Sequence, residues 1–487
     1  MENLSKIVKK LSDKEYQHLL ELVSGNKRNK PFHVLEYIRT ETFDEEYLIQ
    51  KLDINQNAYY TLKSRLLDKV AIALAHKPIN AIKEKVANVS VSIFQDDRSL
   101  TIKYLKDLEK ELLEYDLSNE LIVVYKALAR HYLYEPEEYE KYDLLYNKHV
   151  AYSLAMEKAE DLLLMFIRNV GNFRLSRTQE DFEKILRIRR EMYNITEMFT
   201  SHRLFVLNNI ISIYYQCLFS GNTAELKDKE MEIEGILKEF ETIFNKYHLD
   251  AFYQNRKPLI DLMFVLYYYS IGSIARGNVY YKSVKAQLPE IIGKHSYTFY
   301  IVMLLRSKLE KYYFDGNLED LKDVNSLLES DFEIDEIEIY HRVRYSLFLS
   351  YIKFFEKDYH SVEKIVKELK IQLTNRQFMQ GCLECQLLLC LIYSLLGDEE
   401  KRKKAIGSLE RQLDLDKPEN KNIYLFIKFL KHITKHGDYE RRLKSSKEIY
   451  EEYCKINHGI NEVLKYIKID EDMMLQLAGQ GSKKASH

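Results

Sequence analysis

The sequence predicts an all-α protein made of stacked antiparallel helix pairs, with a small helical module at the N-terminus. Two observations lead to this fold class. First, the chain holds only 15 Gly and 6 Pro in 487 residues, and such a shortage of helix-breaking residues favours long helices. Second, apolar helices that run into a Gly-Asp or Gly-Asn turn recur at a nearly fixed spacing in the C-terminal half.

The recurring turn is clearest at Gly397-Asp398, where an apolar run ends and the charged run Glu399–Lys404 begins. Together with Gly397, equivalent dipeptides begin at Gly221, Gly277, Gly316, Lys357 and Gly437, so that the six positions are separated by intervals of 56, 39, 41, 40 and 40 residues. A period of this length indicates an α-solenoid, in which each helix pair buries its apolar face against its neighbours.

Residues 1–78 are predicted to form the N-terminal module. Thr42-Phe-Asp-Glu45 is a capping box that begins a short helix, and a longer helix follows over Ala58–Ala75. This order resembles a helix-turn-helix element. In that interpretation, polar side chains near the start of the longer helix contact DNA: Asn57, Tyr60, Thr61, Lys63 and Ser64. The alternative is a module that only caps the first repeat.

Residues 79–456 are predicted to form the helical repeats. Three amphipathic helices come first: Ala81–Phe94, Leu100–Tyr115 and Asn119–Tyr134. Pairs of a more apolar and a more polar helix follow: Leu162–Leu175 with Glu180–Tyr193, Leu204–Phe219 with Leu226–Tyr247, Leu259–Arg276 with Tyr280–Ile292, Tyr297–Phe314 with Leu318–Leu328, Ile337–Phe355 with Val362–Leu373, Phe378–Leu396 with Arg402–Leu413, and Ile423–Lys435 with Arg441–Cys454. Residues 457–487 are predicted to hold a capping helix near Glu471–Leu477 and a disordered tail.

The turns carry a further pattern. Small residues, Ser270, Ser350 and Cys390, stand seven positions before three of the turn residues, and aromatic residues, Tyr313 and Phe354, stand three positions before two of them. In these features the chain resembles the tetratricopeptide-repeat family, although its period of about 40 residues exceeds that family's 34. The resemblance implies a right-handed superhelix whose concave wall, made by the first helix of each pair, binds a peptide or protein.

Counting back from each turn residue gives the positions that such a wall exposes. They are Asn208, Tyr215, Tyr267, Tyr268, Arg306, Tyr313, Arg344 and Tyr351. Tyrosine and arginine suit partner binding, because they offer a large contact area and directed hydrogen bonds. The alternative is that several of these tyrosines pack between neighbouring helix pairs.

Each sequence motif that resembles a catalytic or metal-binding site lacks a residue that such a site requires. Cys382 and Cys385 fall inside an apolar helix and have no second pair, so they are predicted to be core cysteines. His432 and His436 share a helix face but lack the glutamate of a metalloprotease motif. Gly272 and Gly277 have the spacing of a phosphate loop but no lysine follows. We therefore expect no enzyme, cofactor or metal.

Composition and net charge indicate which kinds of partner the chain can bind. The formal charge is −2, with 73 basic and 75 acidic residues, so overall charge favours neither nucleic acid nor an anionic membrane. Neither a signal peptide nor an apolar run of ~18 residues is present, and five cysteines favour a reducing cytoplasm. We expect a non-catalytic cytoplasmic scaffold or adaptor that binds a protein or peptide. The alternative is a transcriptional regulator with DNA contact at its N-terminus.

Overall fold

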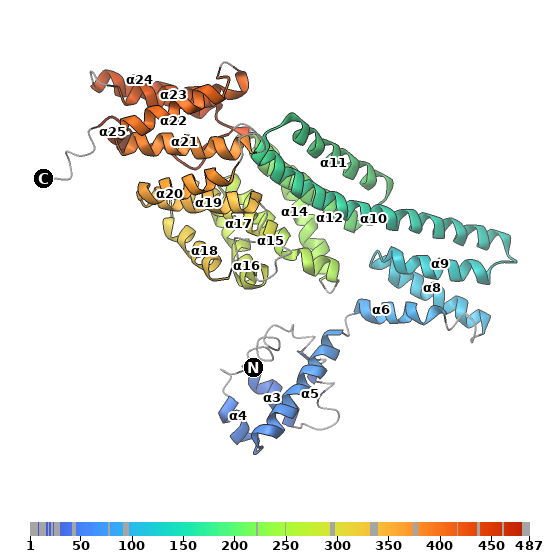
Figure 1. Cartoon of the computed structure of the whole chain (residues 1–487). Helices are drawn as coiled ribbons and strands as arrows, with labels where there is room; N and C mark the ends of the chain where they lie inside the picture. The colour runs from blue at the N-terminus through green and yellow to red at the C-terminus, as the bar shows by residue number, and fades with distance from the viewer. Residues whose placement is uncertain are drawn as a thin grey trace. The chain divides into compact units, whose positions relative to one another are not determined.

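The structure is a computed structural model of the chain (Figure 1). It describes residues 8, 16–17, 19–20, 23, 30–40, 45–75, 78–90, 97–220, 223–248, 250–292, 298–331, 339–373, 378–415, 417–435, 439–459 and 462–479. These residues form helices and the turns between them, and none lies in a strand. The all-α prediction is confirmed.

The chain divides into two compact units. Unit 1 consists of Met1–Ser153 with Tyr247–Gln254, and unit 2 of Leu154–Lys246 with Asn255–His487. Unit 1 contains α3 (Lys30–Thr40), α4 (Glu45–Lys51), α5 (Gln56–Ala75), α6 (Pro78–Ala87), α8 (Arg98–Glu114), α9 (Ser118–His131) and the first part of the long α10 (Pro136–Ser176). The predicted segment boundaries at residues 78 and 456 stay predictions.

The N-terminal helices have the order that the sequence predicts. Between α4 and α5, Asp53 adopts a φ of 49°, a left-handed conformation that aspartate tolerates better than most residues. The Asn55 side chain accepts a hydrogen bond from the Ala58 backbone N–H at 2.8 Å, and so caps α5. Apolar side chains such as Leu35, Leu48 and Tyr59 form the core beneath these helices. Thr42 of the predicted capping box lies outside the described residues.

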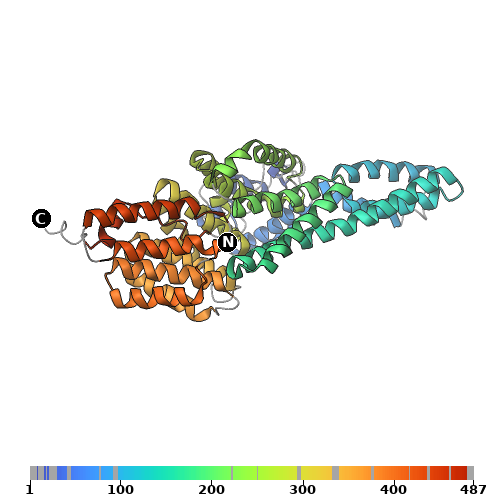
Figure 2. The same cartoon turned by 90° about the horizontal axis from the view of Figure 1, so that it is seen from above.

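Unit 2 contains the remaining helices. They are the rest of α10, α11 (Gln179–Met198), α12 (His202–Phe219), α13 (Thr223–Asp228), α14 (Glu230–Lys246), most of α15 (Ala251–Ser270), α16 (Ile274–Ile292), α17 (Thr298–Asp315), α18 (Leu318–Asp331), α19 (Ile339–Phe355), α20 (Tyr359–Gln372), α21 (Met379–Leu395), α22 (Glu399–Gln412), α23 (Lys421–Ile433), α24 (Tyr439–Ile456) and α25 (Glu471–Leu477). From α16 to α22, sequence neighbours pack on one another, and α23 packs on α21 and α24. The helices α21 to α24 lie side by side in both views (Figures 1 and 2).

Three of the predicted turns are confirmed. Gly316, Lys357 and Gly397 have φ angles of 66°, 61° and 71°, in the left-handed region that ends many helices. After two of them, an aspartate caps the next helix: Asp358 accepts from the Ser361 backbone N–H, and Asp398 accepts from the Lys401 backbone N–H. The dipeptides at Gly221 and Gly437 lie outside the described residues.

The predicted turn at Gly277 is wrong. Gly272 takes the turn, with a φ of 78°, and Gly277 lies inside α16. A Cβ atom at Gly277 would approach the Tyr269 ring to 2.4 Å. This glycine therefore permits α15 and α16 to pack closely, and it does not end a helix. The observed turn residues 272, 316, 357 and 397 are 44, 41 and 40 residues apart.

Candidate functional site beneath the C-terminal segment

The clearest polar site of unit 2 involves residues 462–470, here called the C-terminal segment, which connect α24 to α25. Two residues near the end of α24 hold its start: the Tyr453 hydroxyl and the Asn457 amide both donate to the Val463 carbonyl, each at 2.8 Å. The Ile469 backbone N–H donates to the Tyr450 hydroxyl at 2.9 Å. Finally, α25 packs against α21 and α23. Both ends of the segment are thus anchored.

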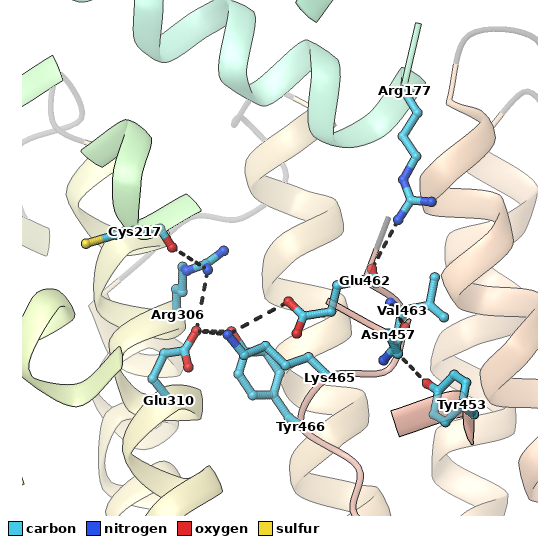
Figure 3. A network of polar contacts seen from close by, with 10 residues as sticks. All are labelled: Arg177, Cys217, Arg306, Glu310, Tyr453, Asn457, Glu462, Val463, Lys465 and Tyr466. Atoms are coloured by element: carbon cyan, nitrogen blue, oxygen red, sulfur yellow. Dashed lines mark hydrogen bonds and ion pairs between the residues drawn. The ribbon is translucent and has the colours of Figure 1, made fainter. Parts of the chain in front are cut away.

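The segment meets α17 at Glu310, whose side chain is almost fully buried. Lys465 donates to Glu310 Oε1 at 2.9 Å, and the Tyr466 hydroxyl donates to the same oxygen at 3.1 Å. Arg306, one turn earlier on α17, lies 3.4 Å from that oxygen (Figure 3). A buried carboxylate is stable only when donors or cations compensate for its lost hydration. Two of these three partners come from the C-terminal segment.

The directions of the pKa shifts in this network indicate that the Glu310 carboxyl is charged. Burial by itself would raise the pKa of the Glu310 carboxyl, but the charges of Lys465 and Arg306 and the hydrogen bonds from the segment lower it below its usual value. Burial would lower the pKa of Lys465, and the nearby carboxylates of Glu310 and Glu462 raise it instead. Burial, followed by the Glu310 charge, raises the pKa of Tyr466 to about 12. At neutral pH the network is a buried ion pair reinforced by a neutral phenol.

Other contacts extend the network on both sides. Arg306 donates to the Cys217 carbonyl of α12 at 3.0 Å, and Arg177 donates to the Glu462 carbonyl at 3.0 Å (Figure 3). The Tyr466 ring packs edge-on against Tyr351 of α19, with 5.7 Å between ring centroids. The segment therefore contacts side chains from several helices that are far apart in the sequence.

Four of the eight predicted wall residues gather around this segment. Arg306 and Tyr351 do so through the contacts above, and Tyr313 accepts a hydrogen bond from Lys468 through its carbonyl. The Lys468 ammonium also lies 3.9 Å from the Tyr313 ring centroid. Arg344 lines a cavity next to Lys465 and Tyr466. Their partner-binding role stays a prediction.

The expectation of an exposed wall is wrong for Arg306 and Tyr351, which are buried. The reason is that the chain's own C-terminal segment covers them. Tyr313 and Arg344 are only half-buried.

The other four predicted wall residues lie elsewhere. Tyr267 and Tyr268 are buried in α15, because they were counted from Gly277, which is not the turn residue. Tyr215 is half-buried, with the Arg189 guanidinium 3.7 Å from its ring centroid, and Asn208 is half-buried on α12. For the two buried tyrosines, the alternative of packing between helices holds.

Sequence reasoning missed Glu310, Lys465 and the arginines at the end of α10. One signal could have revealed Glu310: it stands four residues after Arg306, the spacing of an ion pair on one helix face. The segment itself offered a weaker signal, the run Val463-Leu-Lys-Tyr-Ile-Lys-Ile469, in which apolar residues flank two lysines.

All five residues proposed for DNA contact lie in the first half of α5. Asn57, Tyr60, Thr61 and Ser64 are exposed, and Lys63 is half-buried. The Lys63 ammonium lies 5.9 Å from the Tyr60 ring centroid, and the Thr61 hydroxyl donates to the Asn57 carbonyl. Their DNA contact stays a prediction.

The residues weighed for metal chemistry have structural surroundings. Cys382, Cys385 and Cys390 are buried in α21, as predicted for core cysteines, and burial raises the pKa of each thiol. His432 contacts the Ser446 hydroxyl at 2.9 Å, whereas His436 lies outside the described residues. Within the described ranges, no group of three or more His, Cys, Asp or Glu side chains could hold a metal ion.

Among the helices that the structure describes, none has both the length and the apolar character needed to cross a membrane. The chain matches no protein-family model, no curated protein and no solved structure.

Proposed function

We propose that unit 2 is a divergent tetratricopeptide-like solenoid that works as a non-catalytic, cytoplasmic binding protein for an extended segment of a partner. The observation that supports this proposal is the way in which the C-terminal segment lies against Arg306, Glu310, Tyr313 and Tyr351. An extended chain with a lysine and a tyrosine in succession is the kind of ligand that this wall accepts. In the described structure that ligand belongs to the same chain.

The contacts define the chemistry that a partner has to supply. Glu310 needs a cation and a hydroxyl donor, which Lys465 and Tyr466 provide. A partner that displaces the segment without replacing both would leave Glu310 with Arg306 alone of its three partners, and breaking a buried ion pair on one side costs about 3–5 kcal/mol. We therefore expect partners with a Lys-Tyr or Arg-Tyr step inside an apolar extended stretch.

Competition between the segment and a peptide in trans tests this function. A fluorescent peptide with the sequence of residues 462–470 should bind weakly to the wild-type chain, because the tethered segment has a high effective concentration. The double variant Lys465→Ala, Tyr466→Ala should bind the peptide more tightly, since its own segment no longer satisfies Glu310. Adding Glu310→Gln should remove that gain.

A scrambled peptide of the same composition serves as the control for charge and apolar character. Equal binding of the peptide to all three proteins, or equal binding of the scrambled peptide to the double variant, would contradict a specific wall.

The second candidate function is DNA contact by the N-terminal helices, as part of a transcriptional regulator. It is favoured by the exposure of Asn57, Tyr60, Thr61 and Ser64 on α5, directly after a turn that helix-turn-helix proteins also have. Lys63 adds a cation on the same stretch. Such a face would contact phosphates and base edges.

A gel shift with the full chain at low salt tests the second candidate. Lys63→Glu should weaken retention of duplex DNA, because one phosphate contact is replaced by a repulsive charge. Lys103→Glu, at an exposed position on α8 of the same unit, is the matched control. If both variants retain DNA as the wild type does, or if the wild type retains none, the DNA-binding function is wrong.

A further inference from the structure

A small polar cavity lies behind the C-terminal segment in unit 2. Its volume is about 30 Å³, enough for two or three water-sized spheres. Its lining residues are Arg174 of α10, Arg306 of α17, Arg344 and Tyr351 of α19, Gln380 and Glu384 of α21, and Glu462, Lys465 and Tyr466 of the segment. The cavity is thus surrounded by five separate parts of the chain.

Positive charge is in excess around this cavity. Four cations but only two carboxylates line it, and Glu310, the carboxylate beside Arg306 and Lys465, is the third in the network. Arg344 lies 3.6 Å from Glu384. No hydrogen bond or ion pair within the described residues involves the Arg174 guanidinium. Four cations, three of them guanidinium groups, therefore meet only three carboxylates.

Unpaired polar atoms point to the same site. The Nε atom of Arg306 and the Oε1 atom of Gln380 are buried without a hydrogen-bond partner, and both side chains are more than nine-tenths buried, at 7% and 5% exposed. An unpaired buried donor next to a positively charged cavity indicates a missing acceptor. When turned over, the Gln380 amide offers its N–H₂ group to such an acceptor, whereas its oxygen could accept only from a protonated oxyanion.

The electrostatics of Arg174 support this view. Burial, together with the like charges of Arg306 and Arg344, lowers the pKa of the Arg174 guanidinium. Arginine nevertheless stays protonated in proteins at neutral pH. The chain therefore holds one buried and two half-buried cations whose like charges repel one another, and a bound anion would turn that repulsion into attraction.

We propose that this cavity binds a small inorganic oxyanion of the phosphate or sulfate class. Planar guanidinium groups from three helices can each donate to a different oxygen of a tetrahedral anion. A lysine ammonium approaches from the segment. The cavity is too small for a peptide chain or a nucleotide, so the free anion is the ligand. Lys465 and Glu462 close the site, and anion binding therefore also fastens the C-terminal segment.

The site shares Arg306, Lys465 and Tyr466 with the proposed wall, but thermal unfolding of the full chain tests it without any partner. The protein is first freed of phosphate and sulfate. Sodium phosphate is then compared with sodium chloride at equal ionic strength and pH. We expect phosphate to raise the melting temperature of the wild type in a saturable way, because a ligand of the folded state alone stabilises it. A rise no larger than that from chloride would overturn the site.

Two variants locate the anion. Arg174→Gln and Gln380→Leu should each weaken phosphate binding by roughly tenfold or more, the effect of one lost charge-assisted hydrogen bond. Arg168→Gln, at an exposed position of the same helix α10, is the matched control and should keep the wild-type response. Without phosphate, Arg174→Gln should melt no lower than the wild type, because it removes an uncompensated buried charge. Retention of the full phosphate response in both cavity variants would refute the proposal.

A further comparison sets the size of the ligand. O-phosphoserine carries the same phosphate group on a larger molecule, and it should not raise the melting temperature. A shift equal to that of inorganic phosphate would overturn the assignment of a free oxyanion.

Discussion

Replacing Glu310 with glutamine is the sharpest perturbation of the polar network. The change keeps the shape of a side chain that is only 1% exposed, but it removes the charge that Lys465 and Arg306 share. The buried Arg306 and the partly exposed Lys465 then lose their nearest carboxylate, and the Tyr466 hydroxyl loses a charged acceptor. Breaking a buried ion pair on one side costs about 3–5 kcal/mol. We expect a loss of that size, felt first at the C-terminal segment.

Hydrogen exchange and urea unfolding measure this loss. The amides of Val463 and Ile469, which are hydrogen-bonded to Asn457 and Tyr450, should exchange faster in Glu310→Gln than in the wild type. The control is Glu319→Gln, which breaks an exposed ion pair with Lys322 at 3.1 Å and should change stability by less than about 1 kcal/mol. If Glu310→Gln has no larger effect than Glu319→Gln, the buried ion pair does not hold the segment.

Three further predictions concern unit 2. Gly277→Ala should lower stability by about 1–3 kcal/mol, because its Cβ would meet the Tyr269 ring at 2.4 Å, whereas Gly407→Ala, with no atom within 4 Å, should leave the melting temperature unchanged or raise it. Burial lowers the pKa of Lys308 to about 8. From about pH 8 to about pH 10.4 the unfolded chain holds a proton that the folded chain has lost, so the free energy of unfolding should rise with pH over this range. Lys308→Met should remove this rise. Maleimide should label Cys454 alone in the native chain, since the other four of the five cysteines are buried, and labelling of a second thiol without denaturant would contradict the packing.

Local sequence signals were enough for much of the helical order. The turns at Gly316, Lys357 and Gly397 follow from a polar dipeptide that ends an apolar run, and the structure has each of them. The helix α25 occupies Glu471–Leu477, where the sequence predicts a helix. In each case the deciding interactions lie within a few residues of one another. A single sequence contains that information.

The error at Gly277 has a different origin. Gly272 and Gly277 both follow an apolar run, and only the dipeptide Gly277-Asn278 matches the pattern of the other turns. What decides between them is the Tyr269 ring, which leaves no space for a Cβ at Gly277. That contact joins two helices, so local pattern cannot reveal it. One wrong turn then misplaced Tyr267 and Tyr268 as wall residues.

The site was predictable only in part, for the same reason. Arg306, Tyr313, Arg344 and Tyr351 were found because the distance from a turn residue fixes the face of a helix. The sequence did not predict that the C-terminal segment covers these residues, because Lys465 and Tyr466 lie 155 and 156 residues after Glu310. The repeat pattern reflects interactions between nearby residues and gives no information on a contact over that separation.

The charges of α17 explain why this wall differs from an open groove. Arg306 and Glu310 meet the C-terminal segment, while Lys308 and Lys311 pair with Asp320 of α18 at 2.8 and 2.9 Å. A helix with buried charges on two faces has to be covered on both, since an uncompensated buried charge costs several kcal/mol. On one face the cover is its sequence neighbour, which is permanent. On the other it is the C-terminal segment, which is held by polar contacts and by buried apolar side chains such as Val463 and Ile469. In the function that we propose, a partner that replaces the segment has to bring its own cation and hydroxyl to Glu310.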